Sequence, residues 1–286
     1  MKKIETHQVP DLLKNRIRLS DYAGAKFSSI PSRKGMKKAI DNGLVTVNGK
    51  TAKTGDWLIG GETIVLFTVE TARNPNLNLN IEVLYEDEYL AVVNKPAGIE
   101  VSGNKKWALE NALSSTITPS NELDAVAQPQ AIHRLDFPTS GVLLIGKTMR
   151  SVSALNQLFK NREVEKKYHA ICIGELPDEG TIDTPIDKKE SVSVYNVISR
   201  LESKKYGGLN LLELSLKTGR RHQLRKHLSG IENPILGDQQ YFIEGKIMTG
   251  NGLYLHASSI RFQHPQTQQE IVVQSPMPKK FKKLFP

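Results

Sequence analysis

Apolar residues recur at helical spacing in two segments of the chain. Residues 33–42 place them on one face, with Ser32 in position to cap the helix and Gly43 in position to end it. Residues 149–160 repeat the pattern and predict a second helix. The other apolar residues come in short runs separated by turn-forming residues, which is typical of strands. These expected strands lie at 44–47, 91–93, 141–145, 168–173, 209–216 and 271–273.

The order of these segments predicts two units. Residues 15–70 form a compact unit that contains the first helix and a tight Asn-Gly hairpin at 48–49. Residues 71–80 are polar, contain a proline and lack any period, which predicts a linker. Short strands dominate residues 81–286 without regular alternation with helices, so the sequence favours an α+β fold.

The charge balance of the chain favours a polyanionic partner. Thirty-nine Lys and Arg against 30 Asp and Glu leave a formal charge of +9. The lone Cys172 can form neither an internal disulfide nor a thiolate zinc site, which favours a reducing compartment. Residues 1–11 lack the apolar run of an export signal, and the longest apolar runs are too short to cross a bilayer. We therefore expect a soluble, cytoplasmic protein.

One segment matches a nucleotide-binding motif letter by letter. Residues 141–148 read GVLLIGKT and fit the pattern GxxxxGK[ST], with Lys147 and Thr148 in the positions for phosphate and magnesium. A phosphate-binding loop follows a strand, whereas here the intervening residues are themselves apolar and strand-like. A buried strand is therefore the preferred interpretation, and nucleotide binding is the alternative.

A polar cluster just before that segment is a better candidate for chemistry. Residues 133–141, HRLDFPTSG, crowd charged and turn-forming side chains between two apolar runs. A loop held between rigid strands is a common place for functional side chains. The alternative is a plain hairpin turn in which Asp136 pairs with Arg134.

A second cluster, residues 218–228, is strongly basic. If Leu224 and Leu228 face the core, Arg221 and Arg225 share another helical stripe, which suits phosphates or the holding of a carboxylate. The alternative is a solvated basic helix. A metal site on the two histidines of this segment is disfavoured, because a separation of five residues is poor helical spacing.

The two clusters belong to a longer series of motifs. In chain order these are NKPAGI at 94–99, HRLDFPTSG at 133–141, KKYHAICIGEL from Lys166, GRRHQLRKHL from Gly219, NPILGDQQY from Asn233 and LHASSIRFQHP from Leu255. With these motifs in this order, residues 81–286 resemble the RluA-type pseudouridine synthases. Residues 15–70, with a basic helix and a VNGK hairpin, resemble the small alpha-L RNA-binding domain named after ribosomal protein S-four.

The resemblance implies a catalytic domain with a mixed, mostly antiparallel sheet that isomerises uridines in RNA without a cofactor or a metal. In that family an aspartate acts as nucleophile or base, and Asp136 matches it. Arg225 matches the basic residue that holds the aspartate in a salt bridge, with Arg220 as a second candidate for this role. Tyr168 matches the tyrosine that packs on the target base and assists proton removal; the alternative is an ordinary strand aromatic.

The resemblance also implies the residues that bind substrate. The target uridine must leave its stack, and Arg134 matches the side chain that fills the vacated space, while His133 is expected to orient the loop. Phosphate contacts are expected from a basic stripe on the small domain, formed by Arg33, Lys34, Lys37 and Lys38.

The sequence leaves several points open. Either ribosomal or transfer RNA fits as the substrate, and the order of the chemical steps is not determined by the residue types. We expect a monomer. The competing hypothesis is a non-catalytic RNA-binding or ribosome-assembly protein on a synthase-like scaffold, which the joint presence of Asp136, Tyr168 and Arg225 disfavours.

Overall fold

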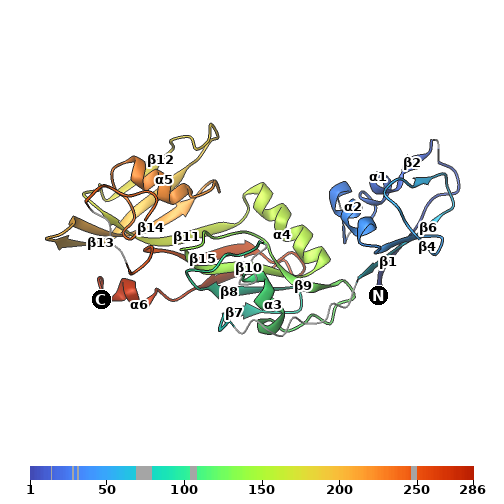
Figure 1. Ribbon diagram of the computed structural model, residues 1–286, viewed down its shortest axis with the longest axis horizontal. Coiled ribbons are helices and arrows are strands. Elements are labelled where there is room, and N and C mark those ends of the chain that lie inside the picture. The colour runs from blue at the N-terminus through green and yellow to red at the C-terminus, as the bar shows by residue number, and fades with distance from the viewer. Residues whose placement is uncertain (14, 28, 31, 69–78, 104–107, 246–249) are drawn as a thin grey trace.

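The chain has an N-terminal unit with its own sheet and hydrophobic core (Figure 1). The computed structural model describes all residues except 14, 28, 31, 69–78, 104–107 and 246–249. The sheet of this unit is antiparallel, in the order β1-β6-β3-β4, and two helices and a two-stranded ribbon complete it. Its elements are β1 (Lys2–Gln8), β2 (Ile17–Arg18), α1 (Leu19–Ala23), α2 (Arg33–Asp41), β3 (Val45–Val47), β4 (Lys50–Thr51), β5 (Trp57–Leu58) and β6 (Thr63–Thr68).

Strand β1 corrects the predicted start of this unit. It pairs with β6 along its length, so the unit begins at Lys2 and not at residue 15. The sequence, KKIETHQ, holds a single apolar residue, Ile4, and therefore shows no alternation from which a strand could be predicted. Most of the expected linker, 71–80, lies outside the described residues.

The helix cap, the helix end and the hairpin turn predicted in this unit are present in the structure. The Ser32 side chain accepts a hydrogen bond from the backbone N–H of Gly35, which caps α2. The helix ends at Asp41, and Gly43 follows with φ +68°. Asn48 and Gly49 both have positive φ, as a two-residue hairpin turn requires.

The larger unit is built on one mixed sheet, which confirms the α+β expectation. Strand order is β12-β13-β14-β11-β15-β10-β8-β7, with β9 beside β10 and β16 beside β15. Among the described strands every pairing is antiparallel except that of β10 with β15. The strands are β7 (Glu82–Glu86), β8 (Leu90–Lys95), β9 (Ala125–Ala131), β10 (Ser140–Thr148), β11 (Glu165–Ile173), β12 (Glu179–Ile182), β13 (Ser193–Ser203), β14 (Gly207–Leu216), β15 (Leu255–Gln263) and β16 (Glu270–Gln274).

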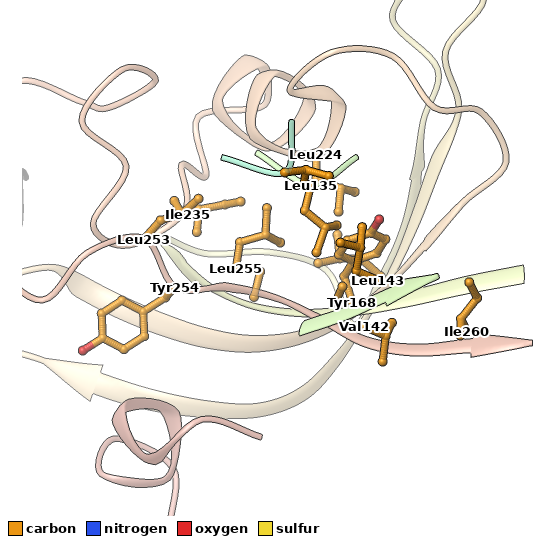
Figure 2. Packing of buried hydrophobic residues seen from close by; sticks show 14 of the residues in the cluster. Leu135, Val142, Leu143, Tyr168, Leu224, Ile235, Leu253, Tyr254, Leu255 and Ile260 are labelled. Carbon is orange, nitrogen blue, oxygen red and sulfur yellow. The ribbon is translucent and has the colours of Figure 1, made fainter. Parts of the chain in front are cut away.

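Helices cover parts of this sheet. The helix predicted at 149–160 is α4, which packs on β10 and begins with a capping box between Thr148 and Ser151. A single core includes Leu135, Tyr168 and Leu224 (Figure 2). No helix among the described residues is long and apolar enough to cross a membrane. The helices of this unit are α3 (Glu110–Thr116), α4 (Met149–Asn161), α5 (Gln223–Gly230) and α6 (Lys279–Lys282).

The segment that matches the phosphate-loop pattern is a buried strand, as preferred. Residues 141–148 lie within β10: residues 141–146 pair with β8, and residues 145, 146 and 148 pair with β9. The segment is therefore extended and is not a loop that could wrap an anion. Lys147 is 4% exposed, and its ammonium donates to the Glu86 carboxylate at 2.8 Å. The lysine that would bind phosphate is thus buried and already paired with a carboxylate.

Candidate active site

A strongly basic cleft of about 1000 Å³ lies where the loop before β10, strand β11, the C-terminal end of α4 and the segment leading into α5 meet. Its acidic lining residues are Asp136 and Glu165. This excess of cations makes the cleft suited to a polyanionic chain. The cationic side chains that line it are Arg134, Lys160, Arg162, Lys166, Lys167, Lys217, Arg220, Arg221 and Arg225.

Asp136 lies in the loop that joins β9 to β10, and its side chain is 17% exposed. The side chain of the neighbouring Leu135 is buried in the core and holds the loop against the sheet. A turn follows, in which the backbone N–H of Thr139 donates to the Asp136 carbonyl at 3.0 Å. The pairing of Asp136 with Arg134, offered as the plain-hairpin alternative, is not among the ion pairs of the described residues.

A buried lysine supports this loop. Lys95, at the end of β8, is fully buried, and its ammonium donates to the carbonyl oxygens of Asp136 at 3.3 Å and Thr139 at 2.7 Å. Burial lowers the pKa of Lys95 to about 8, against the opposing attraction of the Asp136 charge. Sequence reasoning assigned no role to Lys95, although the NKPAGI motif contains it.

Two side chains flank the Asp136 carboxylate. Nη1 of Arg225 lies 3.5 Å from one oxygen, and Nε2 of His222 lies 3.7 Å from the other. The structure therefore brings Asp136 and Arg225 together as the resemblance implied. Burial lowers the pKa of His222, and the nearby Arg225 lowers it further, whereas Asp136 raises it.

The main partner of Arg225 is a residue that sequence reasoning did not assign. Asp238 accepts from Arg225 Nε at 2.7 Å and from Nη2 at 2.8 Å. The guanidinium also lies over the Tyr241 ring, 5.0 Å from its centroid. Asp238 and Tyr241 both belong to the NPILGDQQY motif, which supported the family resemblance. The sequence alone did not show that residues of this motif contact Arg225.

Two expectations for the neighbouring arginines are wrong. Arg221 does not share a helical stripe with Arg225, because α5 begins only at Gln223 and Arg221 precedes it in an exposed turn. Arg220 does not hold Asp136, because its Nε donates to the Glu190 carbonyl at 3.0 Å. Both still line the cleft.

Tyr168 and His133 are also at the cleft. Tyr168 is 7% exposed, and burial together with the Asp136 charge raises the pKa of its hydroxyl, so this group stays protonated at neutral pH. His133 accepts a hydrogen bond from the backbone N–H of Leu144 and stacks on Phe159. Burial lowers the pKa of His133 to about 3, so the ring is neutral and suited to orienting the loop.

The predicted RNA-contacting cations are exposed. Arg134 is exposed in the loop beside Asp136. On the N-terminal unit Arg33 pairs with Asp21 at 2.5 Å. The whole stripe of α2 is exposed, namely Arg33, Lys34, Lys37 and Lys38.

The described residues contain no cluster of potential metal ligands. His227 is buried and bonds to Ser193 and to the Thr184 carbonyl, so it faces away from a shared site with His222, which bonds to Tyr241.

Comparisons with known proteins identify the family of this chain. Residues 89–230 match the family model described as RNA pseudouridylate synthase. The chain is 31% identical to ribosomal large subunit pseudouridine synthase D of Xanthomonas campestris, over 92% of this chain and 88% of that protein. It is 33% identical to tRNA pseudouridine synthase C of Vibrio vulnificus, over 72% of this chain and 94% of that protein. The solved structure of human RNA pseudouridylate synthase domain containing 1 has the same fold, with a TM-score of 0.59 at 23% identity, over 71% of this chain and 86% of that one. The chain therefore belongs to the RluA-type family of RNA pseudouridine synthases.

Proposed function

We propose that Asp136 is the catalytic carboxylate of this pseudouridine synthase and that the substrate is structured ribosomal or transfer RNA. The observation that carries the proposal is the position of Asp136, between Arg225 and His222 in a cleft that is otherwise rich in cations. The two RNA classes are those named for the relatives from Xanthomonas and Vibrio.

The reaction is an isomerisation, so its atoms balance without a co-reactant. The bond from uracil N1 to the ribose breaks, the base turns, a bond from C5 to the ribose forms, and the C5 proton is lost as N1 gains one. An ionised carboxylate can start this sequence by attack on the ribose or base, or by removal of a ribose proton. In each case the Arg225 guanidinium, 3.5 Å from Asp136, supplies a positive charge beside the reacting carboxylate.

The remaining cleft residues have separate roles in the proposal. Tyr168 provides a flat surface against the base, and its hydroxyl, kept protonated, acts as a hydrogen-bond donor instead of a free base. His133 holds the loop through its bond to the Leu144 backbone. Arg134, exposed beside Asp136, fills the gap that the flipped uridine leaves in the RNA stack.

Phosphate contacts supply most of the affinity in this proposal. The cations of the cleft bind the RNA backbone near the target, and the exposed stripe on α2 allows the N-terminal unit to act as a second RNA-binding module. We propose that the protein works as a monomer in the cytoplasm, where its one thiol, the buried Cys172, stays reduced.

Tritium release tests the role of Asp136. RNA that lacks pseudouridine and carries tritium at uridine C5 is incubated with the wild type, with Asp136→Asn, and with Asp178→Asn as a control at an exposed aspartate that pairs with Arg200. We expect release by the wild type and the control only. If the wild type binds this RNA and releases nothing, the non-catalytic scaffold is the better description. If Asp136→Asn releases tritium at the wild-type rate, another group performs the chemistry.

A further inference from the structure

The environment of Asp238 suggests a role beyond that of a structural ion pair. Its carboxylate is fully buried and accepts four hydrogen bonds. Two come from Arg225, and two come from the backbone N–H groups of Gln240 at 2.9 Å and Tyr241 at 3.1 Å. One carboxylate therefore joins the loop that follows it to the first turn of α5.

This pairing determines which edge of Arg225 meets Asp136. The Nε and Nη2 edge is occupied by Asp238 at 2.7 and 2.8 Å, so only Nη1 is directed at Asp136, at 3.5 Å. A guanidinium free to turn would offer a carboxylate two short bonds at once. Because the fork is already used, Asp136 keeps a nearby positive charge while its oxygens are not locked into a second two-bond pair. A carboxylate in this state is available to react with the substrate.

The same loop holds the other neighbour of Asp136. The bond from the Tyr241 N–H to Asp238 places the Tyr241 ring against the Arg225 guanidinium and its hydroxyl 3.0 Å from Nδ1 of His222. The opposite nitrogen of His222 lies 3.7 Å from Asp136. Asp238 thus fixes Arg225 directly and His222 through Tyr241.

We propose that Asp238 is a positioning residue for the catalytic centre, which holds Arg225 and His222 so that Asp136 is oriented and free to react. The proposal rests on the assignment of Asp136 as the catalytic carboxylate. Asp238 does not line the cleft, so it acts through its neighbours and not on the RNA.

The central test compares two buried aspartates. Asp238→Asn keeps the shape of the side chain and removes its charge. Asp124→Asn is the matched control, because Asp124 is also buried and pairs with an arginine, Arg150, away from the cleft. We expect Asp238→Asn to lower kcat about 100-fold with little change in KM, since displaced catalytic groups cost about that factor. The control should leave kcat near the wild-type value.

A double-variant cycle distinguishes positioning from a general loss of stability. If Asp238 acts through Arg225, then Asp238→Asn should add little to the loss already caused by Arg225→Lys. Independent, multiplying effects of the two changes would overturn the proposal. So would a kcat for Asp238→Asn equal to that of the control.

Two further readouts keep the test decisive. Should Asp238→Asn fail to fold, Asp238→Glu retains the charge and shifts it by one methylene; an intermediate kcat supports positioning, and wild-type kcat contradicts it. An active Asp238→Asn beside an inactive Asp136→Asn rejects the positioning role alone. An active Asp136→Asn rejects the proposed function and this inference with it.

Discussion

Gly141 allows β10 to lie against β15 directly after the Asp136 loop, and its replacement by alanine should disrupt both the fold and the site. Gly141 has φ +115°, and it faces Ala257 in the parallel pairing of the two strands. A Cβ at this position would lie 2.1 Å from the Ala257 carbonyl oxygen. Because ordinary contact begins at 3.4 Å and the obstacle is backbone, β15 would have to move away by about 1.3 Å.

Gly141→Ala should lower the free energy of unfolding for two reasons. A non-glycine residue in this backbone region costs about 1–3 kcal/mol, and forcing apart packed strands costs about 1–3 kcal/mol more. Gly141→Ala should therefore lower the free energy of unfolding by about 2–6 kcal/mol, a large part of the roughly 5–15 kcal/mol that keeps a typical protein folded. Gly207 provides the control, because it also has a positive φ, +79°, but a Cβ there meets nothing within 4 Å. Gly207→Ala should cost only about 1–2 kcal/mol, for the backbone alone.

Urea unfolding followed by circular dichroism measures both variants, and tritium release measures their activity. Gly141→Ala should also reduce kcat in the fraction that remains folded, because Ser140, which starts β10 beside the Asp136 loop, bonds to His256 of β15. Equal losses of stability in Gly141→Ala and Gly207→Ala would refute the argument, since they would show that the close strand contact carries no energy.

Three further predictions concern other parts of the chain. Lys95→Met removes a buried donor from the carbonyls of the Asp136 loop, so it should lower the free energy of unfolding by about 1–3 kcal/mol in urea titrations and reduce kcat as well. Unchanged values for both would contradict the supporting role. Burial lowers the pKa of His256 to about 4, whereas a histidine in an unfolded chain has a pKa of about 6.5. As pH falls, the unfolded chain therefore binds this proton before the folded chain does, and the free energy of unfolding should decrease by about 3 kcal/mol between about pH 6.5 and pH 4. In His256→Gln this part of the pH slope should vanish, and an unchanged slope would assign it to other groups. Replacing Lys34, Lys37 and Lys38 by Gln should weaken RNA binding and reduce the slope of log affinity against log salt by about 1 for each lysine that contacts a phosphate; the same slope in the triple variant would remove the N-terminal unit from the RNA interface.

The parts of the fold that short-range patterns encode were predicted from the sequence. Helix α2 with its Ser32 cap, helix α4, and the hairpin at Asn48 are each decided by residues within a few positions of one another. Strand β1 was missed because its sequence is mostly polar and its partner, β6, lies about 60 residues away along the chain. Only the pairing of the two strands makes that segment a strand.

The candidate site likewise has one part that the sequence predicts and one part that it does not. Asp136, Tyr168 and Arg225 could be named because each sits in a recognisable motif. Their supports could not, because the contacts of Lys95 with the Asp136 loop join residues about 40 positions apart and depend on how β8 and β10 align.

The choice between Arg220 and Arg225 shows why a motif alone is insufficient. Both are long cations in the same short segment, and either could reach a carboxylate in the absence of other constraints. The helix begins at Gln223, whose side-chain oxygen accepts hydrogen bonds from the Arg220 backbone N–H and from the Thr218 hydroxyl. These bonds fix the turn before the helix. The Arg220 guanidinium then donates to the Glu190 carbonyl. Arg225, in the first turn of the helix, pairs with Asp238. The arginine beside Asp136 is thus held in place by a second aspartate, 13 residues beyond Arg225, and this contact exists only once the chain is folded.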